Sequence, residues 1–222
     1  MANRHTGNIR ISKKVSKKVI GILLAFIFMV CLFAFITYEI FSEKEVDFDN
    51  AIFGFLHQST SPAVTRFFTF ITFFGSTSFL LPAYLALSFY YLFFKKNTRL
   101  SLYIATIGIT STALLRLAKF FFQRHRPIDP LITAVTGFSF PSGHSFSSFT
   151  LCGLIIYIIW MMKISLLIRL LVISGLFIFA TLIAVSRVYL HVHYASDVFA
   201  GFCLSIIWLM ISMYVLKLSS IL

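Results

Sequence analysis

Two histidines and one aspartate have the residue types and the spacing for acid, base and nucleophilic chemistry. His193 and Asp197 are four residues apart. This is one helical turn, so the carboxylate can hold one ring nitrogen and leave the other free to attack an electrophile. His144 lies in the first turn of an expected helix, where it can give a proton to a leaving oxygen. We therefore expect His193 to be a nucleophile, Asp197 to orient it and His144 to act as the acid.

A second group of residues is suited to hold a phosphoryl group beside that nucleophile. The transition state of phosphoryl transfer spreads charge over three equatorial oxygens, so catalysis depends on positioned cations and N–H donors. Arginine offers a planar fork matched to phosphate oxygens, and lysine adds a point charge. A Ser-Gly pair at a helix start supplies backbone N–H groups and a close approach. The expected phosphate-binding residues are Lys119, Arg126, Ser142, Gly143 and Arg187.

The composition indicates that membrane helices must position these residues. Hydrophobic residues make up 59% of the 222 and charged residues 12%, and the mean hydropathy is +0.94. A soluble domain of this size needs more polar surface. The net charge is +12, but the basic residues form short clusters between apolar runs, which is typical of membrane topology and not of a nucleic-acid-binding face. We expect one membrane domain over residues 1–222 and no nucleic-acid partner.

Six apolar runs approach the roughly 20 residues that a membrane-spanning helix needs. They cover residues 19–38, 75–94, 100–122, 145–162, 170–186 and 197–216. A signal peptide has a shorter apolar core and a cleavage site, so we interpret the first run as a retained helix. Residues 47–57 have apolar side chains at helical spacing and are expected to form a short helix in the outer interface, either an ordinary loop helix or one that admits lipid. The sequence therefore predicts an all-α integral membrane protein.

The distribution of lysine and arginine predicts the orientation of these helices, because basic residues are enriched on the cytoplasmic side. Twelve basic residues fall on one side of the predicted topology: Arg4, Arg10, Lys13, Lys14, Lys17, Lys18, Lys95, Lys96, Arg99, Lys163, Arg169 and Lys217. All 7 acidic residues fall on the other side. We expect both termini in the cytoplasm. The connections after the third and fifth spans, which carry the chemistry, should then meet at the outer face.

Three short blocks of this sequence resemble the signature motifs of the type 2 phosphatidic acid phosphatase superfamily. The blocks are Lys119-x6-Arg126-Pro127, Pro141-Ser142-Gly143-His144 and Ser186-Arg187-x5-His193-x3-Asp197. Their order and internal spacings match, and the resemblance extends over about residues 75–201. It implies the same roles as above for the histidines, the aspartate and the phosphate-binding residues, and it implies that neither a metal nor another cofactor is needed. Vanadate-dependent haloperoxidases share these blocks but are soluble, so the six apolar runs argue against that branch.

The resemblance implies a membrane lipid phosphatase that works through a phosphohistidine intermediate. Phosphatidylglycerophosphate, phosphatidic acid and undecaprenyl diphosphate all fit as substrates, and the partners implied are the lipid and the bilayer, without an obligate protein partner. The alternative is a catalytically silent protein that binds or transports anionic lipid. Such a protein needs the basic phosphate-binding residues but neither a nucleophile nor an acid, so His144, His193 and Asp197 argue against it.

Four further polar residues near the motifs have open roles. Arg116 lies one turn before Lys119 and is expected either to support the phosphate or to pair with the aspartate of the third block. Arg124 and His125 are expected at the rim, where they contact a head group or only solvent. His191 occupies a position where relatives commonly carry a small residue, often glycine. It either crowds the pocket or points away from it, and we favour the second.

Overall fold

The computed structural model describes residues 17–43, 47–58, 60–133 and 135–216, and over these ranges it contains helices and connections without β-strands. In chain order the elements are α1 (Lys17–Tyr38), the π-helical turn η1 (Glu39–Glu43), α2 (Asp47–His57), α3 (Pro62–Phe73), α4 (Thr77–Phe89), the π-helical turn η2 (Tyr90–Phe94), α5 (Thr98–Phe122), α6 (Gly143–Met161), α7 (Leu166–Tyr189) and α8 (Ala195–Val215).

Six segments of the described chain are long and apolar enough to cross a membrane. They are Val19–Ser42, Thr77–Phe94, Thr98–Phe122, Gly143–Met161, Leu166–Tyr189 and Ala195–Val215. Each lies close to one of the runs expected from the sequence, so the predicted all-α fold with six spans is confirmed. Apolar side chains such as Leu24, Phe28 and Leu117 are exposed on these helices, as expected where the surrounding solvent is lipid.

A separate helix, α3, precedes the second span; it starts after the N-cap Ser61 and has Pro62 in its first turn. The chain then turns through Gly75 before α4 begins. A β-carbon on Gly75 would lie 2.5 Å from Cγ2 of Ile183. The turn therefore packs against α7 more closely than any larger residue permits.

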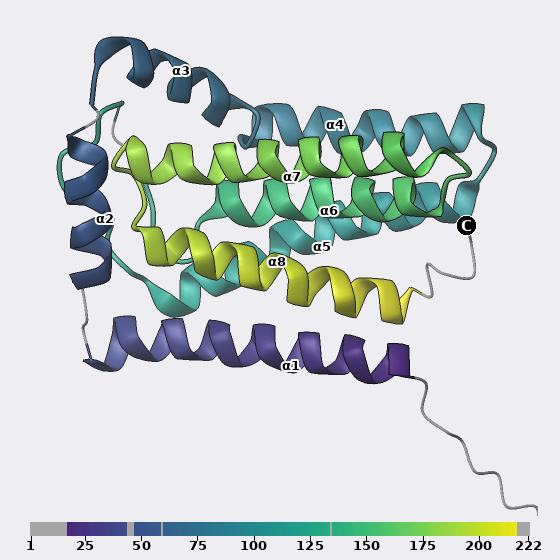
Figure 1. Cartoon of the computed structure of the whole chain (residues 1–222), viewed down its shortest axis with the longest axis horizontal. Helices are drawn as coiled ribbons and strands as arrows, with labels where there is room; N and C mark the ends of the chain where they lie inside the picture. The colour runs from purple at the N-terminus through teal and green to yellow at the C-terminus, as the bar shows by residue number, and fades with distance from the viewer. Residues whose placement is uncertain (1–16, 44–46, 59, 134, 217–222) are drawn as a thin grey trace, which may run out of the picture.

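The spanning helices α4 to α8 form a bundle, and α1 lies along α8 (Figure 1). α6 packs most extensively against α7 and α8. One buried apolar cluster joins Leu100, Ile104 and Ile107 of α5 to residues of α6 and α8. At the left end of Figure 1, α2 runs across the ends of the spanning helices. The connections α5–α6 and α7–α8 reach the same end, as the alternation of six spans predicts.

The first turns of α6 and α8 are in direct contact at that end of the bundle. The backbone N–H of Ser142 donates to the carbonyl of Asp197 across 3.0 Å, and Oγ of Ser145 donates to the carbonyl of Val198 across 2.7 Å. A β-carbon on Gly201 would lie 2.8 Å from the Ser142 carbonyl oxygen. Small residues thus let the two helices approach closely. This contact brings the second and third sequence blocks together.

Candidate active site

His193 and Asp197 form a buried pair at the start of α8. Nδ1 of His193 lies 3.4 Å from Oδ2 of Asp197, and the two side chains are 2% and 0% exposed. The same carboxylate oxygen accepts a hydrogen bond from the backbone N–H of Tyr194 across 2.9 Å. An aspartate in the first turn of a helix is stabilised by such N–H groups. The start of α8 therefore holds the carboxylate in place, and the carboxylate holds the imidazole.

A third buried side chain, Ser139 in the α5–α6 connection, completes this pair. Its hydroxyl donates a short hydrogen bond to Oδ2 of Asp197 and lies 3.2 Å from Nδ1 of His193. Ser139 was not predicted as a site residue. It lies outside the three blocks, and its partners are 54 and 58 residues away, so no local pattern distinguishes it from other serines.

The other ring nitrogen of His193 faces a cation. Nη1 of Arg126 lies 3.1 Å from Nε2 of His193. Because a guanidinium only donates, Nε2 must carry the lone pair and Nδ1 the proton, which faces Asp197. Burial, together with the nearby cations Arg126 and Lys119, lowers the pKa of His193 to about 3, although Asp197 acts in the opposite direction. His193 is therefore neutral near pH 7, with the lone pair of Nε2 directed toward the basic residues.

The three expected phosphate-binding cations come from three different segments. Arg126 and Lys119 are within electrostatic range of His193, and Arg187 is within electrostatic range of Arg126. Nζ of Lys119 donates to the carbonyl of Phe138 across 2.6 Å. Nε of Arg126 donates to the carbonyl of Gly137 across 2.9 Å. Nη1 of Arg187 donates to the hydroxyl of Thr72 across 2.6 Å.

None of these three cations forms an ion pair with another described residue. Arg187 is only 3% exposed, and its Nε has no hydrogen-bond partner among the described residues. Cations taken out of water without counter-charges are costly, so such a cluster is expected where an anion binds. The arrangement thus has the electrostatics of a phosphate site.

The Ser142-Gly143-His144 block begins α6 beside this cluster. Ser142 is the N-cap, and its hydroxyl accepts from the backbone N–H of Ser145 at 3.5 Å. A β-carbon on Gly143 would lie 3.9 Å from Cε of Lys119, so the backbone of this turn is next to the lysine. His144 is close enough to Arg126, Lys119, Arg187 and His193 for electrostatic interaction. All eight residues expected from the sequence therefore gather at one end of the bundle.

Arg124 has a different place from the one expected at the rim. Its side chain is 10% exposed, and Nη1 donates to Oδ1 of Asp197 across 2.7 Å. Of the two alternatives for Arg116, pairing with Asp197 is wrong, because Arg124 forms the ion pair with that carboxylate. Arg116 is exposed and lines a groove between α4 and α5 that also contains Tyr84 and Ser147.

The two remaining open positions are both outside the cation cluster. His125 is exposed. The ring of His191 packs against Phe53 of α2, with 5.2 Å between ring centroids. The backbone of His191 has a φ of +54°, a left-handed conformation that glycine adopts without strain. This accounts physically for the glycine that the resemblance leads us to expect there. Among the described residues, no group of three or more His, Cys, Asp and Glu side chains is arranged to hold a metal.

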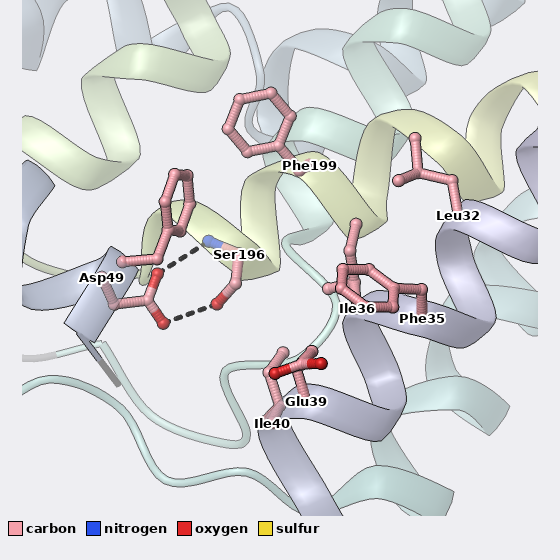
Figure 2. Close-up of a pocket in the computed structure, with 9 residues that line it drawn as sticks. Leu32, Phe35, Ile36, Glu39, Ile40, Asp49, Ser196 and Phe199 are labelled. Atoms are coloured by element: carbon pink, nitrogen blue, oxygen red, sulfur yellow. Dashed lines mark hydrogen bonds between the residues drawn. The ribbon is translucent and has the colours of Figure 1, made fainter. Parts of the chain in front are cut away.

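A separate apolar cleft of about 600 Å³ lies between α1, α2 and α8 (Figure 2). Leu32, Phe35 and Ile36 of α1 face Phe199 of α8 across it. Its lining also includes Asp49 and Ser196, which are hydrogen-bonded to each other (Figure 2). None of the eight expected site residues lines this cleft. The cleft is therefore distinct from the phosphate site.

Residues 96–220, more than half of the chain, match the PAP2 superfamily. The chain belongs to this superfamily. Together with the six spans, this membership confirms the expectation of a multi-pass membrane lipid phosphatase.

Individual relatives agree with this assignment. Phosphatidylglycerophosphatase B of Bacillus subtilis (strain 168) is 31% identical over 151 residues, which are 66% of this chain and 72% of that protein. The crystal structure of the transmembrane PAP2-type phosphatidylglycerolphosphate phosphatase of Bacillus subtilis matches with a TM-score of 0.73 and 27% identity, over 90% of this chain and 95% of that one. The crystal structure of Aquifex aeolicus LpxE matches with a TM-score of 0.57 and 27% identity, over 74% of this chain and 93% of that one.

Proposed function

We propose that this protein hydrolyses a phosphate ester or diphosphate of a membrane lipid through a phosphohistidine on His193, without a metal. One observation carries the proposal. Arg126 and Lys119 lie near a neutral imidazole whose opposite nitrogen is held by Asp197. Arg187 lies near Arg126, and none of the three cations forms an ion pair with a described residue. A buried neutral imidazole is a nucleophile at physiological pH, and the cations stabilise the charge that develops on phosphorus-bound oxygens.

In the first step, Lys119, Arg126 and Arg187 bind the phosphoryl oxygens together with the hydroxyl of Ser142 and the backbone N–H of Gly143. The phosphate takes the place of the contact between Arg126 and Nε2. The lone pair of Nε2 then forms the N–P bond while the bond from phosphorus to the leaving oxygen breaks. His144 donates its proton to that oxygen, which leaves as a lipid alcohol, or as a lipid monophosphate when the substrate is a diphosphate.

Asp197 and Ser139 support the nucleophile during this step. The imidazole acquires positive charge when its Nε2 is phosphorylated. The carboxylate that accepts the Nδ1 proton stabilises this charge and keeps the ring oriented, as in catalytic triads. Ser139 donates to the same carboxylate oxygen, which limits its rotation. The two residues therefore act on the same ring nitrogen.

In the second step, the phosphohistidine is hydrolysed. His144, now neutral, takes a proton from water, and the oxygen of that water attacks phosphorus as the N–P bond breaks. Inorganic phosphate is released, Nε2 regains its lone pair, and His144 is protonated again. The same residue thus serves first as acid and then as base.

We place the protein in the cell membrane as a single domain over residues 1–222, with both termini in the cytoplasm and the site facing the periplasm or exterior. The support is the distribution of basic residues. Lys95 and Lys96 before α5, Arg99 in its first turn, Lys163 before α7 and Arg169 in its first turn lie at the end of the bundle opposite to His193. Basic connections favour the cytoplasmic side.

The substrate is an amphiphile whose chains remain in the bilayer while its phosphate reaches the end of the helices. Phosphatidylglycerophosphate, phosphatidic acid and undecaprenyl diphosphate satisfy this requirement. The Bacillus subtilis relative is named for phosphatidylglycerophosphate, so this lipid is our first choice. The bilayer is the only other partner that the mechanism requires; it needs neither nucleic acid nor a second protein.

The test is phosphate release from these three lipids by the purified protein in detergent, with His193→Ala as the blank. We expect release that vanadate inhibits, that EDTA leaves intact and that the variant lacks. Release by His193→Ala above a trace would refute the nucleophile, and loss of activity in EDTA would refute the metal-free scheme. No release from any lipid by the wild type would favour the alternative of a protein that only binds or transports anionic lipid.

A further inference from the structure

Arg124 is held between two carboxylates that are far apart in the sequence. Its Nη1 donates to Oδ1 of Asp197 across 2.7 Å, and its Nη2 donates to Oδ2 of Asp49 across 2.9 Å. Asp49 belongs to α2, 75 residues before the arginine, and Asp197 lies 73 residues after it. One guanidinium therefore joins the helix that crosses the end of the bundle to the start of α8.

The surroundings of this bridge fix it further. Nη1 of Arg124 also donates to the hydroxyl of Ser196 across 2.8 Å, and the guanidinium lies 4.0 Å from the centroid of the Tyr194 ring. Asp49 accepts from the backbone N–H and the hydroxyl of Ser196 at 2.9 and 2.6 Å (Figure 2). Asp49 is 2% exposed. Charged hydrogen bonds of this kind are strong when they are shielded from water.

The two oxygens of Asp197 have separate partners as a result. Oδ2 faces Ser139, the backbone N–H of Tyr194 and Nδ1 of His193. Oδ1 is occupied by Arg124. A carboxylate held on one side in this way cannot turn its plane away from the imidazole without breaking an ion pair. Arg124 forms its hydrogen bonds with Ser196, Asp197 and Asp49 and not with His193, and it lies outside the cluster that receives the phosphate.

We propose that Arg124 is a positioning residue that holds Asp197 in the plane of His193, and that Asp49 anchors it from α2. This inference rests on the proposed function of His193 and Asp197. Because Arg124 acts through Asp197, its removal should slow the chemical step and leave substrate binding nearly unchanged. Because Asp49 acts through Arg124, its effect should disappear when Arg124 is absent.

The experiment measures kcat and KM for full-length protein in detergent, with the lipid of the panel that the wild type hydrolyses fastest. We expect Arg124→Gln to lower kcat by about 10- to 10²-fold, the effect of losing one charged hydrogen bond in the transition state, with KM within about twofold. The kcat of Arg124→Lys should lie between those of Arg124→Gln and the wild type, because an ammonium keeps the charge but cannot donate to two carboxylates as a guanidinium does. The matched control is Arg99→Gln, at the exposed opposite end of α5.

A double-mutant cycle separates positioning from general stability. Asp49→Asn should lower kcat in the wild type and have no further effect on Arg124→Gln. The proposal is overturned if Arg124→Gln has the same kcat as the Arg99→Gln control or if its loss lies in KM alone. It is also overturned if the effects of Arg124→Gln and Asp49→Asn on kcat multiply in the double variant. Should Arg124→Gln fail to fold, Asp49→Asn decides alone, because it keeps the size and one hydrogen-bonding oxygen of the side chain. If Asp49→Asn retains the wild-type kcat, the proposal that Asp49 anchors Arg124 is overturned.

A second readout does not depend on activity. In protein with ¹⁵N-labelled histidine, the nitrogen chemical shifts report which ring nitrogen of His193 carries the proton. We expect the Nδ1–H form in the wild type and a mixture of tautomers in Arg124→Gln; an unchanged Nδ1–H form in the variant overturns the positioning role. If the wild type hydrolyses no lipid but Arg124→Gln still changes the tautomer of His193, the proposed function is refuted and the positioning role of Arg124 is supported.

Discussion

Nη1 of Arg126 lies 3.1 Å from Nε2 of His193, so the nitrogen expected to attack phosphorus is covered by a cation expected to bind phosphate. The same guanidinium donates to the carbonyls of Val192 and Gly137 at 2.7 and 2.9 Å. These carbonyls hold the arginine where an arriving phosphate meets it. Binding of the phosphate and exposure of the nucleophile are therefore one event.

Arg126 and Arg187 should each contribute to turnover. We expect Arg126→Ala or Arg187→Ala to lower kcat by roughly 10²- to 10³-fold, by analogy with the loss of one transition-state donor. The measurement is kcat and KM for phosphate release. A change confined to KM would mean that the arginines bind only the ground state. Arg99→Ala, an exposed arginine at the other end of α5, should retain wild-type kinetics.

Ser139 should matter although it lies outside the three sequence blocks. Ser139→Ala removes the hydroxyl that donates to Asp197. Since a hydrogen bond to a charged group contributes about 1.5–3 kcal/mol, we expect a loss of roughly 10- to 10²-fold in kcat. Ser205→Ala is the matched control, because Ser205 is also buried but donates to the carbonyl of Phe202 within α8. Equal rates for the two variants would remove Ser139 from the mechanism.

The depressed pKa of His193 predicts a dependence of stability on pH. The imidazole has a pKa of about 3 in the folded protein, against a usual value of 6.5, so the unfolded chain binds more protons between these values. The contribution of His193 to stability is complete above pH 6.5 and is lost as the pH falls toward 3. We expect thermal unfolding of the wild type to shift to lower temperature between pH 6.5 and 4.

His193→Gln isolates this effect, because glutamine does not titrate. The decrease in unfolding temperature on acidification should be smaller in His193→Gln than in the wild type. Parallel curves for the two proteins would mean that the folded state does not disfavour the imidazolium. The buried imidazole also predicts that an acidic limb of the activity profile near pH 6.5 belongs to a group other than His193.

Gly75 should be sensitive to a single methyl group. A β-carbon there would lie 2.7 Å from Cδ2 of His144 and 2.5 Å from Cγ2 of Ile183. We expect Gly75→Ala to destabilise the protein by about 1–3 kcal/mol, as overpacking does, and to lower activity by displacing His144. Gly175→Ala in α7 is the control, because nothing lies within 4 Å of its β-carbon. Thermal unfolding and phosphate release measure both effects, and a fully active, stable Gly75→Ala would contradict the packing.

The spans and the eight expected site residues could be predicted because their signals are local. A run of apolar residues such as 100–122 indicates a membrane helix without knowledge of its neighbours. The four-residue spacing of His193 and Asp197 indicated their contact, although His193 lies before the N-cap Tyr194 and only Asp197 belongs to α8. Their meeting with Ser142 followed from the alternation of six spans, which places two connections at one end.

The residues that support the site could not be predicted, because their partners are distant in the chain. Asp49 and Ser196 are 147 residues apart, and Thr72 lies 115 residues before Arg187. Pairing with Asp197 is one of the two roles that the sequence leaves open for Arg116. Arg116 lies one helical turn before Lys119 in α5. After α5 ends, the chain turns so that Arg124, and not Arg116, contacts the carboxylate of Asp197. That turn depends on the left-handed residue Gln123, whose conformation the sequence does not indicate.

Two side chains from the N-terminal third, Asp49 and Thr72, hold arginines of the phosphate site region. A chain cut before Gly75 would keep every residue of the three blocks and lose both of these partners. We therefore expect the complete blocks to be insufficient for a working enzyme in this protein. The smallest active unit should begin no later than α2, and shortened or rearranged versions of the chain should be designed around that limit.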